Sequence, residues 1–168
     1  KEVDQLHEST KNQAPAVRST VHKIREQEFK ERTNIGEALR FPQYLEAISE
    51  RAFYKCGGLK CIQFDYEVHK SRKSSSQSPT SQQKQYFLKS IDKFAFYGCN
   101  QLQAVFFNKV SDESQGNEGV RSLSIGDSVF SHCENLCYVE LPENLVKIDE
   151  RLFYSCEKLV SVFIPQRT

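Results

Sequence analysis

One pattern of apolar residues recurs five times along the 168 residues of this chain. Each copy starts with Ile, has Phe five residues later, and has Leu or Ile six residues after the Phe. The copies begin at Ile24, Ile48, Ile91, Ile125 and Ile148. A period of about 20 to 30 residues predicts a solenoid, because one copy cannot bury its apolar side alone and stacked copies can.

The columns of this alignment predict the structure of one copy. After the Leu column, two apolar positions alternate with one polar position, as in Val139 and Leu141, which is typical of a short strand with one buried face. The segment from Ile to Cys is too short for a stable helix and is expected to form a turn or one loop of 3₁₀. The prediction is a mainly β solenoid of five stacked repeats, with parallel strands and turn or 3₁₀ returns.

A column of cysteines lies three residues after the Phe column. It consists of Cys56, Cys99, Cys133 and Cys156, with Arg32 in the first copy. Cysteine is among the residue types most often buried, so this column predicts an inward ladder of structural thiols. Cys61 and Cys137 lie off the ladder, and neither spacing offers the second ligand pair of a closed zinc site. We expect no metal and no cofactor.

Two insertions interrupt a unit of about 23 residues. The copies are 24, 43, 34 and 23 residues apart, and the excess falls at 65–86 and 108–121. The first insertion is rich in Ser, Gln and Lys, which predicts a solvated loop, and the second is acidic. Residues 1–20 are expected to form a leader or a cap, in part helical, before a solenoid over 21–168.

The segment SIGDSVFSHCENLCYVELPENLVKIDERLFYSCEKLVSVFIP resembles BspA-like leucine-rich repeats, which occur in surface proteins of bacteria and of mucosal protozoan parasites. The resemblance covers 21–165. It implies an α/β leucine-rich-repeat solenoid, curved and right-handed. It also implies non-catalytic protein–protein recognition or adhesion, sometimes to host matrix proteins, at the cell surface or after secretion.

Composition and motifs exclude several function classes. A net charge of +1, from 23 basic and 22 acidic residues, gives no general attraction to nucleic acid. No apolar run approaches the roughly 18 residues of a membrane span. The four histidines stand outside any hydrolase, phosphate-loop or metalloprotease motif. We therefore expect a protein partner and no enzyme activity.

The residues predicted to bind that partner lie at strand positions that alternate with the core. They are Leu39, Gln63, Phe106, Tyr138, Glu140 and Phe163. Large rigid rings on a repeat surface are suited to anchoring a partner. The alternative is that these aromatic rings pack on one another, on the acidic insertion or on the leader.

A second functional class stays open on the sequence alone. The chain could be an intracellular scaffold or structural subunit, held in a larger assembly by its insertions and by an uncapped C-terminal repeat. In that case Lys70, Arg72 and Lys73 of the first insertion are candidate contacts to an acidic partner. Three possibilities stay open for the C-terminal repeat: the chain is a fragment of a longer array, something covers this repeat, or the chain self-associates through it.

Overall fold

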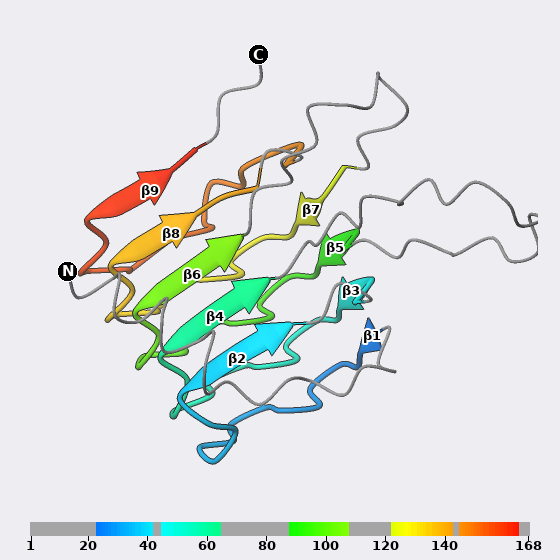
Figure 1. Ribbon diagram of the computed structural model, residues 1–168, viewed down its shortest axis with the longest axis vertical. Helices are drawn as coiled ribbons and strands as arrows, with labels where there is room; N and C mark the ends of the chain where they lie inside the picture. The colour runs from blue at the N-terminus through cyan, green and yellow to red at the C-terminus, as the bar shows by residue number, and fades with distance from the viewer. Residues whose placement is uncertain (1–22, 42–44, 65–87, 108–121, 143–144, 165–168) are drawn as a thin grey trace, which may run out of the picture.

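Five longer strands lie side by side in the computed structural model (Figure 1). They are β2 Ala38–Phe41, β4 Cys61–Phe64, β6 Ala104–Phe107, β8 Tyr138–Glu140 and β9 Ser161–Phe163. All neighbours pair in parallel, in the order β2-β4-β6-β8-β9. Each coil of the solenoid contributes one strand to this sheet, as the repeat predicts.

The structure describes residues 23–41, 45–64, 88–107, 122–142 and 145–164. The expected leader at 1–20, the insertions at 65–86 and 108–121, and the candidate contacts Lys70, Arg72 and Lys73 lie outside these ranges.

A second parallel sheet, which the sequence analysis missed, holds the Ile column. Its strands are β1 Lys23–Ile24, β3 Ala47–Ile48, β5 Ser90–Ile91 and β7 Ser124–Ile125, in the order β1-β3-β5-β7. The Ile is the second residue of every strand and is buried in all four. Each strand has only two residues, so it leaves no period-two signal in the sequence.

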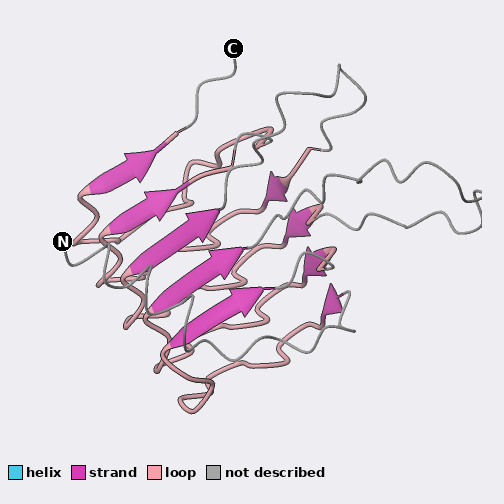
Figure 2. Ribbon diagram, in the orientation of Figure 1, coloured by secondary structure: helices cyan, strands magenta, loops and turns pink. Residues whose placement is uncertain are grey.

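A run of turns connects each short strand to the longer one. Some amides donate three residues back within the coil, as Tyr54 N does to Arg51 O (3.1 Å). Others donate to the next coil, as Phe53 N does to Ala95 O (2.7 Å). Left-handed residues four positions apart, such as Arg51 (φ 53°) and Lys55 (φ 54°), bend this segment repeatedly. In the described ranges the return is made of turns and contains no helix (Figure 2).

The core is a set of ladders that cross the coils. The Phe column stacks ring on ring, with centroid separations of 4.9 Å for Phe29–Phe53 and Phe53–Phe96, 5.6 Å for Phe96–Phe130, and 6.1 Å for Phe130–Phe153. The Ile, Leu and Val columns pack around it in one cluster. Burial of each large side chain contributes about 1.5–3 kcal/mol, so the stacked columns hold the coils together.

The first coil departs from the predicted register by one residue. Leu39, expected on the outer side of its strand, is buried in the core and pairs with Ile62. Ala38, expected in the core column, takes the outward position. Leu39 follows Ile35 by four residues, one more than in the other copies, and Gly36 (φ 94°) lies in the lengthened turn. A shift of one residue moves every side chain of a strand to the opposite face.

The fifth coil is only partly packed. Ile148 belongs to the Ile column by spacing, yet it is 45% exposed, whereas Ile91 is fully buried. In this coil Leu145 forms an isolated parallel bridge with Leu123, and no fifth short strand forms in the described part of the chain. A position in the Ile column is buried when its coil has neighbours on both sides. The fifth coil has a described neighbour on one side.

Candidate binding surfaces

The side chains of the five-stranded sheet that point away from the core form what we call the outer sheet face. It consists of Ala38, Arg40, Cys61, Gln63, Ala104, Phe106, Tyr138, Glu140, Ser161 and Phe163. Parallel pairing in register places equivalent residues of successive coils next to one another. Tyr138 therefore lies between Ala104 and Ser161, and Glu140 lies beside Phe163.

The middle of the outer sheet face is a second small core. Cys61, Ala104 and Phe106 are buried there, with Ala38 and Tyr138 packed against them. The Phe106 and Tyr138 rings are 5.5 Å apart between centroids and tilted by 38°. These rings therefore pack on each other, as the alternative in the sequence analysis anticipates.

The six predicted binding residues fall into three groups. Leu39 lies in the main core and not on the outer sheet face. Gln63 and Phe106 lie on that face but are buried. Tyr138 and Glu140 are half-buried, and Phe163 is 41% exposed. Gln63, Phe106, Tyr138, Glu140 and Phe163 each take part in an interaction within the chain.

The exposed large apolar side chains of the described chain all belong to the fifth coil. We call them the end surface: Val146, Ile148, Tyr154, Val160, Phe163 and Ile164. Val160 is the most exposed of them, at 87%. Phe163 belongs to both surfaces, because β9 is the last strand of the sheet. Sequence reasoning named only Phe163 and assigned Ile148 and Ile164 to core columns.

Backbone amides mark the same end. In earlier coils the amides of the Phe residue and of the residue two positions later donate to the next coil, as Phe130 N does to Leu152 O (3.1 Å) and His132 N to Tyr154 O (2.7 Å). The equivalent amides of the fifth coil belong to Phe153 and Ser155, and they meet no acceptor among the described residues. The fifth coil therefore presents both apolar side chains and backbone donors.

The cysteine ladder points into the core. Its thiols donate to the carbonyl of the Phe one coil earlier, as in Cys99 Sγ to Phe53 O (3.1 Å) and Cys133 Sγ to Phe96 O (3.3 Å). Burial, which disfavours the thiolate, raises the pKa of Cys56 and Cys156 to about 11 and also raises the pKa of Cys99 and Cys133. All six cysteines lie in the described ranges, and none of them forms a disulfide there. A raised pKa makes a thiol a poor nucleophile, so the ladder has a structural role.

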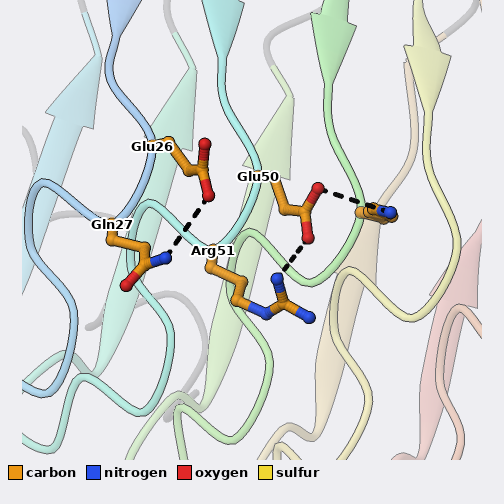
Figure 3. Close-up of polar contacts among 5 residues, drawn as sticks. Glu26, Gln27, Glu50 and Arg51 are labelled. Atoms are coloured by element: carbon orange, nitrogen blue, oxygen red, sulfur yellow. Dashed lines mark hydrogen bonds and ion pairs between the residues drawn. The ribbon is translucent and has the colours of Figure 1, made fainter.

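Charged side chains on the turns pair with one another. Glu50 accepts from Arg51 in its own coil and forms an ion pair with Lys93 in the next coil (3.4 Å; Figure 3). Asp149, next to Glu150 in the sequence, forms an ion pair with Lys147 (3.6 Å). Such ion pairs link neighbouring coils and turns. They do not place two carboxylates where both could act as acid and base on one substrate.

Two further findings concern metals and membranes. In the ranges that the structure describes, no three His, Cys, Asp or Glu side chains are grouped so that they could hold a metal ion. No helix in those ranges is long and apolar enough to cross a membrane.

Comparison with known proteins agrees with this architecture. The family described as BspA type leucine rich repeat region matches residues 5–117 and 117–168, in six copies. The fold is similar to the crystal structure of a T. pallidum leucine rich repeat protein, TpLRR, with a TM-score of 0.60 and 23% sequence identity. The match covers 89% of this chain and 57% of that chain, so this chain spans little more than half of that protein's length. No curated protein matches the sequence.

Proposed function

The chain belongs to the BspA type leucine-rich repeat family, and on that premise we propose that it recognises a protein partner through the C-terminal part of the outer sheet face. Leucine-rich repeats of this kind generally mediate protein–protein interaction and are typically not enzymes. The proposal narrows this general role to one surface and three residues: Tyr138, Glu140 and Phe163.

The observation that carries the proposal is the exposure of Phe163 beside Glu140. Their strands pair in register, so an exposed ring and a carboxylate lie next to each other at the edge of the sheet. An aromatic side chain that is partly exposed on a rigid strand buries a large area with little loss of entropy when a partner covers it. The neighbouring carboxylate adds a requirement for a donor or a positive charge on the partner.

The buried part of the face has a supporting role in this proposal. Phe106 packs under Tyr138 and fixes the orientation of that ring (5.5 Å between centroids). Gln63 and Phe106 are therefore not contact residues, and Leu39 supports the first coil from inside.

We place this recognition in adhesion, at the cell surface or after secretion, with host matrix proteins as the partner class. Family membership supports that setting, because proteins of the family are often surface-exposed or secreted. The second candidate is a structural subunit of a larger assembly, and the apolar end surface favours it.

Binding to immobilised purified extracellular matrix proteins tests the proposal. A Phe163→Ser, Glu140→Lys double variant is expected to bind at least about tenfold more weakly than the wild type, the loss that an interface anchor of about 1.4 kcal/mol or more produces. Tyr154→Ser is the matched control, since it removes an exposed aromatic ring from a turn of the same coil. Equal losses in both variants, or no binding to any matrix protein, would rule out adhesion through this face.

A further inference from the structure

The middle of the outer sheet face is buried, although the described residues place nothing above it. Gln63 is 2% exposed, Phe106 is 5% exposed and Ala104 is fully buried. Every described residue that packs in this small core belongs to the five-stranded sheet itself. The turns and the short strands pack on the opposite side of the sheet, in the main core. The burial of the outer sheet face therefore requires a cover.

Neighbouring strands alone do not bury these side chains. A side chain on a sheet stands roughly perpendicular to it, so residues on adjacent strands screen its flanks and leave its tip to solvent. Gln63 has Arg40 on one side and Phe106 on the other, and its amide would reach water if the face were open. Arg40 and Glu140, one strand further out, are half-buried. The cover is therefore centred on β4 and β6 and thins toward β2 and β8.

The cover has to offer apolar side chains, because the floor that it buries is largely apolar. This floor consists of Cys61, Ala104 and Phe106. Outside the described ranges, the longest run of apolar residues is APAV, at 14–17 in the leader. The insertions at 65–86 and 108–121 are mostly polar or charged. Among these segments the leader matches the chemistry of the floor best.

The length and the proline of the leader also suit this position. The leader joins the first coil at Lys23, and an extended chain of its length reaches at most about 65 Å. Parallel strands lie about 4.8 Å apart, so the distance from β2 to β8 is about 15 Å. Pro15 favours an extended backbone and has no amide N–H, so it adds no unpaired donor when it is buried.

We infer that the middle of the outer sheet face is a docking site for an extended apolar segment, and that residues 14–17 of the leader occupy it. The leader is an intramolecular ligand, and its attachment to the first coil gives it a high effective concentration at the site. It leaves the C-terminal part of the face to a partner. The inference does not depend on the proposed partner binding, because none of its tests uses a partner.

Labelling of Cys61 with N-ethylmaleimide in the folded full chain tests the inference, since this thiol lies on the outer sheet face and not in the cysteine ladder. Peptide mass spectrometry gives the rate for each cysteine. Val17→Asp puts a charge into the apolar contact and is expected to raise the Cys61 rate at least about tenfold. The rate of Cys99, which lies in the main core, should not change while the chain stays folded. Val110→Asp, the same change in the second insertion, is the matched control and should leave Cys61 protected.

A disulfide trap tests the location without weakening the contact. The leader variants are Ala14→Cys, Ala16→Cys and Val17→Cys, and the insertion variants are Ser76→Cys and Ser114→Cys. Mild oxidation is expected to join at least one leader thiol to Cys61 and neither insertion thiol, because a disulfide forms only when the two Cα atoms come within about 7 Å. The trap also decides the question if Val17→Asp unfolds the chain and releases Cys99.

Several results would overturn the inference. Cys61 could be labelled as fast in the wild type as in Val17→Asp, or Val110→Asp could release Cys61 as much as Val17→Asp does. A disulfide from an insertion to Cys61, or none from any leader position, would equally place another cover, or no cover, on the outer sheet face.

Discussion

The thiol of Cys99 donates to the backbone carbonyl of Phe53 in the preceding coil, at 3.1 Å. The same contact recurs between Cys133 and Phe96 and between Cys156 and Phe130, so a side chain ties each coil to the one before it. The ladder explains why a small residue with a donor occupies a column that is otherwise surrounded by Phe and Leu.

Replacing Cys99 separates the role of the thiol as a donor from its role as a small apolar group. Cys99→Ala removes the donor and the volume of the sulfur, and it is expected to lower the free energy of unfolding by about 1–3 kcal/mol. Cys99→Ser keeps a donor and should cost less. Urea denaturation of both variants gives the comparison, and an alanine variant as stable as the serine variant would show that the thiol only fills space.

The raised thiol pKa values make stability depend on alkaline pH. In the unfolded chain thiols ionise around their ordinary pKa of 9.0, whereas Cys56 and Cys156 stay protonated in the folded chain up to about 11. Between these values the folded chain binds more protons than the unfolded chain. The contribution of these thiols is therefore complete below about pH 8 and falls as the pH rises from 9 to 11.

Urea midpoints measured from pH 8 to 11 check this dependence. Cys156→Ser removes one of the titrating thiols, so its decline across this range should be shallower than that of the wild type. If the urea midpoints of the two proteins fall in parallel with pH, groups other than Cys156 cause the loss of stability.

Leu39 and Arg40 test the register of the first coil. Leu39 is buried in the core, so Leu39→Ala should lower the free energy of unfolding by about 2–4 kcal/mol. Arg40→Ala should cost clearly less, because Arg40 lies on the outer sheet face. Thermal unfolding of the two variants tests this expectation. A larger loss of stability for Arg40→Ala than for Leu39→Ala would support the register expected from the sequence.

Much of the fold follows from spacing alone. Phe53, Cys56, Leu59 and Ile62 each occur at the predicted interval and each is buried. Burial of these columns depends on side-chain size at a fixed period, which the sequence displays directly. The Leu39 offset escaped prediction because one extra residue beside Gly36 can be absorbed either in the turn or in the strand.

The candidate site was harder to predict than the fold. Phe106 and Phe163 occupy the same position in their strands, and the sequence cannot distinguish them. The structure buries Phe106 and leaves Phe163 exposed, because exposure depends on which neighbours cover each coil. The end surface could not be predicted for the same reason, because the spacing of Ile164 predicts a core residue.

Alanine variants of Ile91 and Ile148 test how the burial of the Ile column depends on neighbouring coils. Both start a copy of the repeat, but Ile91 is fully buried between two coils and Ile148 is 45% exposed. Ile91→Ala should lower the free energy of unfolding by about 2–5 kcal/mol, since it leaves a cavity that packed coils cannot close. Ile148→Ala should lower the free energy of unfolding by less than about 1 kcal/mol, because water already reaches this partly exposed side chain. Denaturant unfolding at low protein concentration gives both values. Equal losses would show that a further segment covers the fifth coil in solution.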